Sequence, residues 1–338
     1  MNDIKLSVII PTHNRAKELA DTLACLKRQS LAAAEYEIIV VDDGSSPPVS
    51  LRESSENPRC LLVRLEGLER SAARNAGAAA AKGHVLVFVD DDMTVGSTFL
   101  DNHLRAHREW PDALVVGSVR LPDGLVATPF GCFRQTLEQR GLPQTRGLKT
   151  MRNLCTAANM SIPRGLFHKL GGFDGSLASS EDQDFAFRHS RRGGKIAFIP
   201  EADAIHNDSA LHISSYCRRA EWGAEHMVPF CKRYPDWPDN VERERVNGPV
   251  QWGREPLAIS ARKLFKLVVA LNAILAILFL ITSIIERVAP NSFALDRCYR
   301  LLLGAHIFHG YRKGRTRASI GDQQAAIATD NWVKADDC

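Results

Sequence analysis

The chain has 338 residues, which is enough to bury one large or two modest hydrophobic cores. Its composition, with 45% hydrophobic and 24% charged residues, is that of an ordinary globular protein, and a net charge of +4 is too small to indicate a nucleic-acid partner. The eight cysteines lie singly, without a CxxC pair, which favours free thiols over a disulfide framework or a zinc site.

The first 120 residues alternate between short β-branched runs and amphipathic or alanine-rich segments, which predicts strands followed by helices. After the first strand, Leu19, Leu23 and Leu26 recur at helical spacing. An alanine-rich helix is predicted over 69–83, with Gly83 as its C-cap. The predicted strands are 6–10, 37–41, 60–65, 85–89 and 113–119, with a further helix between the last two.

This alternation predicts an α/β fold with a mostly parallel sheet flanked by helices. In such sheets ligands bind beyond the carboxyl ends of the strands. Three predicted strands end in the polar loops "PTHNR", "DDGSS" and "DDDM". We therefore expect all three loops to face one crevice.

The pattern weakens between about 124 and 153, which predicts loops and short elements around an acceptor cleft. A strand that stops at Pro163 follows, and then a short helix. The segment 180–194 has an acidic first turn and late basic residues, as the helix dipole favours, so it predicts another helix. A final strand is predicted over 195–200.

A long apolar segment distinguishes the C-terminal part. Residues 267–285 carry no charge and as one helix would measure about 28 Å, close to the hydrocarbon thickness of a bilayer. The alternative is a buried core helix. Basic residues flank both sides, so the segment suits crossing the membrane or dipping into it. The segment 297–317 mixes apolar and basic residues and could form an interfacial helix, and a loose polar tail is expected from about Ala318.

Three consecutive aspartates, Asp90, Asp91 and Asp92, directly follow the predicted strand 85–89. Side chains alternate along an extended chain, so Asp90 and Asp92 can face the same side. Two such carboxylates are suitable ligands for Mg²⁺ or Mn²⁺. The alternative is an exposed acidic loop that caps the next helix, and a DDD motif alone favours it. The other carboxylates of the chain favour the metal.

Two further acidic clusters lie at corresponding places. Asp42 and Asp43 end another strand, where an aspartate can accept hydrogen bonds from a base or sugar, or form an Asx-turn. Glu181, Asp182 and Asp184 open a helix. One of them could serve as a general base while the others cap the helix, and capping is the simpler role for each taken singly.

The motifs "SVIIPTHNR", "VVDDGSS", "ARNAGAAAAKG", "VFVDDDM", "AANMSIPR", "GGFD" and "SEDQDFAFR" occur in this order. In order and spacing they resemble the family 2 glycosyltransferases of the GT-A fold, over about residues 4–208. The resemblance implies an inverting transfer of a sugar from a nucleotide-diphosphate donor, commonly a UDP-sugar, to a hydroxyl of a saccharide or lipid-linked acceptor. It further implies a divalent cation and a place in cell-surface polysaccharide or glycolipid biosynthesis.

The resemblance also implies roles for particular residues. Asp182 corresponds to the catalytic base, and Asp43 to the aspartate that hydrogen-bonds the nucleotide base. Asp90 and Asp92 correspond to the metal-binding carboxylates, with His206 as a candidate further ligand, while Asn75 and Gly77 are expected to serve packing. The implied nucleotide-binding residues are Pro11, Thr12, Arg15, Asp43, Arg70, Arg74, Asp90 and Asp91.

We expect a catalytic domain over 1–245, with a nucleotide-binding half (4–120) and an acceptor half (121–245), then a membrane-associated region over 255–317 and a polar tail over 318–338. The N-terminus shows no apolar run with a cleavage site, so no secretory signal is expected. We therefore expect the catalytic domain to lie on the cytosolic face of the cytoplasmic membrane, with a single transmembrane or re-entrant segment near 267–285.

Two other functional classes remain open from the sequence. A nucleotidyltransferase of related fold usually has a loop rich in glycine and arginine after the first strand, where this chain has "PTHNR". A membrane-tethered module that binds nucleotides or glycans without activity would tolerate loss of Asp182.

Overall fold

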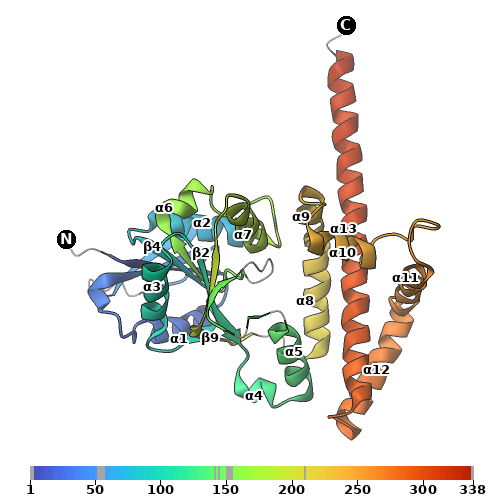
Figure 1. Ribbon diagram of the computed structural model, residues 1–338, viewed down its shortest axis with the longest axis horizontal. Helices are drawn as coiled ribbons and strands as arrows, with labels where there is room; N and C mark the ends of the chain where they lie inside the picture. Colours follow the sequence, from blue (N-terminus) through green and yellow to red (C-terminus); the bar gives the residue numbers. More distant parts are fainter. Residues whose placement is uncertain are drawn as a thin grey trace. The chain divides into compact units, whose positions relative to one another are not determined.

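The computed structural model describes residues 4–51, 58–140, 142–143, 145–149, 155–208 and 211–335, with side chains described up to Ser319. The chain divides into two compact units (Figure 1). The first comprises Met1–Ala127 and Arg134–Ser209, and the second comprises Thr128–Phe133 and Ala210–Cys338. The first unit contains the sheet, and the extent of the catalytic domain to about residue 245 stays a prediction.

The described part of the first unit forms one nine-stranded sheet in the order β3-β2-β1-β4-β8-β6-β9-β5, with β7 also paired to β9. The α/β fold class is confirmed. The strands are β1 (Leu6–Thr12), β2 (Tyr36–Asp43), β3 (Arg59–Leu65), β4 (Val85–Val89), β5 (Met93–Val95), β6 (Leu114–Arg120), β7 (Gly147–Lys149), β8 (Asn159–Pro163) and β9 (Ile196–His206).

The predicted parallel arrangement holds for the N-terminal half, where β3, β2, β1 and β4 are all parallel neighbours. The C-terminal half is mixed. β8 runs antiparallel to both β4 and β6, and β5 and β7 run antiparallel to β9. Because β1, β2 and β4 point the same way, the loops after them all leave the sheet at one edge, as the sequence predicts.

Helices cover both faces of this sheet. On one face α1 and α3 bury Leu19, Leu23 and Phe99 against alternate strand residues such as Val8 and Val87. On the other face α2, α6 and α7 pack on the remaining strand residues. The helical elements up to residue 209 are α1 (Ala16–Leu26), the 3-10 turn η1 (Ala33–Glu35), α2 (Arg70–Ala80), α3 (Phe99–Glu109), α4 (Asp123–Val126), α5 (Pro129–Gln139), α6 (Arg164–Lys169) and α7 (Glu181–Arg191).

Three local predictions were wrong. Helix α2 ends at Ala80, and Gly83 is not its C-cap; a Cβ at Gly83 would lie 2.5 Å from the carbonyl carbon of Leu6, so glycine permits close approach to β1. A short strand, β5, was not predicted and lies between the aspartates and α3, which is the helix expected before the strand 113–119. The weakly patterned stretch contains the eleven-residue helix α5; its residues 141, 144 and 150–153 lie outside the described part.

The second unit is helical in its described part. The elements after residue 209 are α8 (Ile213–His226), α9 (Val228–Arg233), α10 (Pro238–Asn247), α11 (Leu257–Val269), α12 (Asn272–Val288) and α13 (Phe293–Ala335). Helices α8 and α13 approach closely because α13 has glycine at the contact. A Cβ at Gly310 would lie 2.0 Å from the carbonyl oxygen of Glu221, and one at Gly314 would lie 2.2 Å from that of Glu225.

The expected continuous helix over 267–285 is not present. Leu271 takes an extended conformation with ψ 132°, which ends α11, and α12 leaves at an angle of 82°. Within the described residues no single helix is long and apolar enough to cross a membrane, although α11 and α12 together meet the length and composition of a bent span. The loose polar tail was also predicted wrongly, because α13 continues to Ala335.

Candidate active site

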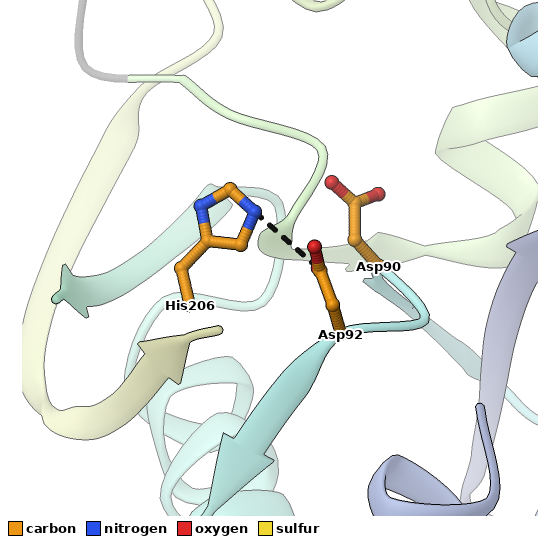
Figure 2. A group of neighbouring side chains, drawn as sticks. All are labelled: Asp90, Asp92 and His206. Carbon is orange, nitrogen blue, oxygen red and sulfur yellow. Dashed lines mark ion pairs between the residues drawn. The ribbon is translucent and has the colours of Figure 1, made fainter. Parts of the chain in front are cut away.

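Asp90 and Asp92 point to the same side of the loop after β4, as the alternation predicts. Together with His206 they form a cluster whose ligand atoms all lie within 4.8 Å of one another (Figure 2). The register between β5 and β9 explains how His206 reaches the aspartates, because Met93 pairs with His206. A histidine more than one hundred residues away in the sequence is thereby placed beside the carboxylates.

The charges in this cluster are closely coupled. Burial would raise the pKa of Asp92, but the neighbouring imidazole of His206, together with Arg15, outweighs burial and lowers that pKa. His206 Nε2 lies 3.3 Å from Asp92 Oδ1, and Arg15 donates to Asp92 Oδ2 at 2.7 Å. Burial would likewise lower the pKa of His206, whereas Asp92 and Asp90 raise it.

These residues fit a divalent cation. Asp92 Oδ1 is buried and receives no well-aligned hydrogen bond from the described residues, although His206 Nε2 lies 3.3 Å away. Two carboxylates and an imidazole offer oxygen and nitrogen donors of the kind that Mn²⁺ and other first-row dications accept. The cluster is therefore a candidate dication site formed by Asp90, Asp92 and His206.

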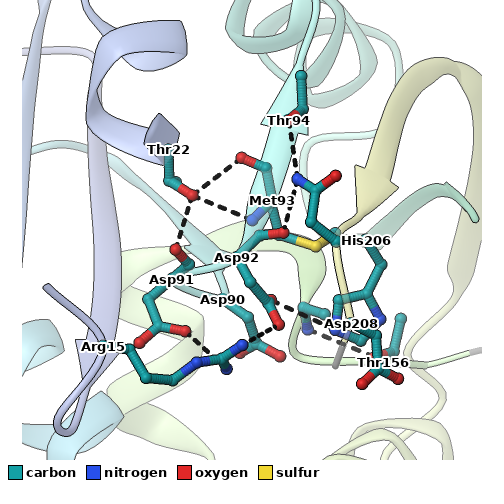
Figure 3. A network of polar contacts seen from close by, with 12 residues as sticks. Arg15, Thr22, Asp90, Asp91, Asp92, Met93, Thr94, Thr156, His206 and Asp208 are labelled. Carbon is teal, nitrogen blue, oxygen red and sulfur yellow. Dashed lines mark hydrogen bonds and ion pairs between the residues drawn. The ribbon is translucent and has the colours of Figure 1, made fainter. Parts of the chain in front are cut away.

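Asp91 points the other way and ties the loop to the first strand. Its carboxylate accepts a hydrogen bond from Thr12 Oγ1 at 2.7 Å and lies 3.0 Å from the Arg15 guanidinium. Burial raises the pKa of Asp91 to about 6, against the lowering effect of Thr12 and Arg15. Arg15 thus bridges Asp91 and Asp92 (Figure 3). Whether Thr12, Arg15 and Asp91 also contact a nucleotide stays a prediction.

Two residues that the sequence analysis did not single out fix the backbone of this loop. Thr22 of α1 lies with its Oγ1 2.8 Å from Asp91 O and accepts the Met93 N–H at 3.0 Å (Figure 3). Asn207 donates its backbone N–H to Asp92 O at 2.9 Å and its side-chain amide to Thr94 Oγ1. Contacts to backbone carbonyls have no sequence signature, so only the tertiary structure reveals them.

Arg74 connects the aspartates with the third acidic cluster. It is almost fully buried on α2, donates to Asp90 Oδ1 at 2.8 Å and to Glu181 Oε1 at 2.8 Å, and lies over the Phe173 ring. Burial would lower the pKa of Arg74, but Asp90 and Glu181 raise it. The guanidinium therefore holds two carboxylates from separate elements in one place.

Asp182 follows Glu181 in the first turn of α7. Burial and the charge of Glu181 raise its pKa to about 7, although Arg74 and the backbone amides of Gln183 and Ala157 act in the opposite direction. A carboxylate with such a pKa can accept a proton near neutral pH. Asp184, two residues further along α7, is fully buried, and its Oδ2 lies 2.8 Å from Arg188 Nε one turn later. Asp184 therefore stabilises the helix.

Asp43 ends β2 near the same edge. Its two carboxylate oxygens accept the backbone N–H groups of Leu68 at 2.7 Å and Glu69 at 2.9 Å, just before α2. His13 Nδ1 lies 2.7 Å from Asp43 O. The loop that follows Pro11 thus contacts the Asp43 loop through His13 and the aspartate loop through Thr12.

The remaining residues have clear positions. Arg70 lies exposed in the first turn of α2. Asn75 serves packing as expected, because it exchanges two hydrogen bonds with the Phe173 backbone. A Cβ at Gly77 would lie 2.5 Å from Ile9 Cγ2, so glycine allows α2 to pack on β1. Arg134 and Asp208 form a buried ion pair, with 2.5 Å between Arg134 Nη2 and Asp208 Oδ2, which the sequence analysis did not predict.

Comparison with known proteins shows that part of the chain resembles glycosyltransferases. Residues 7–157 match the sequence model of glycosyl transferase family 2. Chondroitin synthase of Escherichia coli is 39% identical over 242 residues, which is 60% of this chain and 34% of that protein. An uncharacterised glycosyltransferase of Haemophilus influenzae is 26% identical over 183 residues, 54% of this chain and 61% of that protein.

A mannosyltransferase from Pyrobaculum calidifontis, solved in complex with GDP-Man and Mn²⁺, has a similar fold. The TM-score is 0.56 at 17% identity, covering 92% of this chain and 88% of that one. Across the curated relatives, the matched regions span from 25% to 66% of the relative's own length. Residues 7–157 thus match glycosyl transferase family 2, and the fold is of the GT-A type.

Proposed function

We propose that this chain is an inverting glycosyltransferase that moves a sugar from a nucleotide-diphosphate donor, most simply a UDP-sugar, to an acceptor hydroxyl. The observation that carries this proposal is the convergence of carboxylates from separate elements. Asp90 and Asp92 cluster with His206, and Arg74 joins Asp90 to Glu181, the neighbour of Asp182. The match of residues 7–157, which include Arg74, Asp90 and Asp92, to glycosyl transferase family 2 supports it.

In this proposal Asp90, Asp92 and His206 hold a divalent cation, Mg²⁺ or Mn²⁺. When bound, such an ion stabilises, as a Lewis acid, the negative charge that develops on a leaving diphosphate. Arg15 keeps Asp92 in position through its 2.7 Å hydrogen bond. Pro11, Thr12, Asp43, Arg70 and Arg74 complete the proposed nucleotide site.

Asp182 is the proposed general base. With its raised pKa it takes the proton from the acceptor hydroxyl, whose oxygen then attacks the anomeric carbon. Attack from the face opposite the diphosphate inverts that carbon. Glu181, held by Arg74, keeps the first turn of α7 in place beside Asp182.

The acceptor class rests on the relatives. Two of them bear the names chondroitin synthase and hyaluronan synthase, which supports a saccharide acceptor in cell-surface polysaccharide synthesis. A lipid-linked saccharide fits the same chemistry, and we propose that the catalytic domain works at the cytosolic face of the cytoplasmic membrane. Contact with the membrane is proposed through α11 and α12, which form the one bent pair that meets the length and composition of a span in the described residues.

The test is incubation of the full chain with a panel of sugar nucleotides and Mn²⁺, with release of nucleoside diphosphate as the readout. We expect release from one donor class, no release with Asp182→Asn, and retained nucleotide binding by that variant. Proton NMR of the product should show the inverted anomer. Formation of a nucleoside triphosphate and a sugar 1-phosphate when inorganic pyrophosphate is added, or turnover by Asp182→Asn close to that of the parent chain, would contradict the proposal.

A further inference from the structure

The second unit contains a pocket of about 380 Å³ that no part of the proposed reaction uses. It lies between α11, α13 and the segment after α10. Its lining includes Pro249, Lys263 and Leu267 on one side and Phe308, Arg312 and Arg315 on the other. Apolar walls with several cations around them are the composition of a site for an amphiphilic anion.

Two of the cations in the pocket already have carboxylate partners. Lys263 is almost fully buried and donates to Glu255 Oε2 at 2.5 Å, and Arg315 forms an ion pair with Glu244. Arg312 has no ion pair within the described residues. Its guanidinium lies over the Phe308 ring, 5.7 Å from the centroid.

Lys266 adds a further cation at the same ring. Its Nζ lies 5.5 Å from the Phe308 centroid. Among the described residues it donates to neutral groups alone, at 2.8 Å to Asn247 Oδ1 and at 3.2 Å to Val246 O. Burial and the charges of Arg262 and Lys263 lower the pKa of Lys266 to about 8. Four cationic side chains thus lie in or beside the pocket, and two carboxylates, those of Glu244 and Glu255, partly balance their charge. A bound anion would offset the remaining positive charge.

Helix α11 also carries exposed apolar side chains. Phe265 and Val268 are 55% and 52% exposed and flank Lys266 and Leu267 in the sequence, and Leu271, at the break after α11, is 56% exposed. Helix α12 exposes further large aliphatic side chains, namely Ile277, Leu280, Ile281 and Ile284. Exposed apolar side chains next to basic residues are typical of helices that lie in a membrane interface.

We propose that this basic pocket, lined by Lys263, Arg312 and Arg315 with Lys266 beside it, binds the phosphate headgroup of an anionic lipid. The exposed apolar faces of α11 and α12 then contact the acyl chains of the same leaflet. The two features are adjacent and chemically complementary to such a lipid, with its phosphate attached to apolar chains. This inference rests on the membrane contact proposed above and is independent of the transferase chemistry.

The test measures co-sedimentation of the full chain with vesicles of phosphatidylcholine alone or with 20% phosphatidylglycerol, in about 0.1 M salt. The pocket variant is Lys266→Gln with Arg312→Gln, and the control variant is Arg218→Gln with Lys313→Gln, which removes the same charge from exposed positions of the same unit. Circular dichroism checks that both fold, and the single variant Arg312→Gln, at an exposed position, replaces the pocket variant if it does not.

We expect the parent chain to prefer the anionic vesicles, with the preference falling about fivefold for each charge removed from the pocket and less for the control. Binding to phosphatidylcholine alone should persist in both variants. If both variants lost the preference for anionic vesicles equally, or if the pocket variant kept it, the pocket would not be the lipid-binding site. A melting temperature raised by inorganic phosphate, without any preference for anionic vesicles, would show a soluble anion instead. If the parent chain bound no vesicle, both the lipid site and the membrane contact would be refuted. The proposed glycosyltransferase activity would still be tested separately, by the release of nucleoside diphosphate.

Discussion

Arg74 provides the sharpest stability test of the site, because one buried guanidinium holds two carboxylates. It donates to Asp90 and to Glu181 at 2.8 Å each, and its own side chain is 2% exposed. Replacement by methionine keeps an apolar chain of similar length but leaves two carboxylates without their counter-charge. Breaking a buried ion pair in this way costs about 3–5 kcal/mol, and the partial exposure of Asp90 places the expected cost at roughly 3 kcal/mol.

The assay is urea unfolding of Arg74→Met in EDTA, followed by circular dichroism, with Arg105→Met as the matched control. Arg105 forms a 2.9 Å pair with Asp101 on an exposed helix surface, so its loss should cost less than about 1 kcal/mol. At a slope near 3 kcal/mol per molar urea, the Arg74 variant should unfold about 1 M earlier. A midpoint equal to that of the control would refute the counter-charge reasoning.

Three further predictions concern pH and packing. Because the pKa of Asp182 is raised to about 7, kcat/KM for transfer should rise with pH through 7 and then level off; a flat profile from pH 5.5 to 8.5 would count against the base. His103 is buried with its pKa lowered to about 4, so the unfolded chain binds more protons below pH 6.5. His103 alone should therefore lower the unfolding free energy by roughly 2–3 kcal/mol between pH 6.5 and 4, and His103→Gln should flatten the pH dependence by that amount in urea titrations; an unchanged slope would remove His103 as a cause. Gly310→Ala should lower the melting temperature by several degrees, because overpacking costs about 1–3 kcal/mol or more. Gly304→Ala, on the same helix but with open space around it, should not lower it. Equal melting temperatures of the two variants would contradict the close contact of α8 and α13.

Much of the fold follows from periodicity. The alternation of strands and helices predicts the α/β class and the shared edge of three polar loops, and the two-residue period places Asp90 and Asp92 on one side. The antiparallel direction of β8 could not be predicted, because strand direction depends on the path of the connection, which the weakly patterned stretch hides. The short strand β5 was missed because three residues carry too little period to recognise.

The parts of the site that could not be predicted depend on tertiary register. The position of His206 follows from its pairing opposite Met93, and nothing local to "AIHNDS" specifies that pairing. Thr22 acts on the loop after β4 through backbone groups, so its sequence context shows only a helix. The break at Leu271 was missed for the opposite reason, because an uninterrupted apolar composition predicts a continuous helix and conceals the turn of 82°.

The most direct measurement of the central claim is Mn²⁺ binding by electron paramagnetic resonance in the presence of UDP. The parent chain should bind one Mn²⁺, Asp92→Asn should weaken that binding at least tenfold, and Asp101→Asn, which removes an acidic group of α3 outside the cluster, should leave it unchanged. Equal Mn²⁺ affinity in the parent chain and Asp92→Asn would contradict a dication held by Asp90, Asp92 and His206.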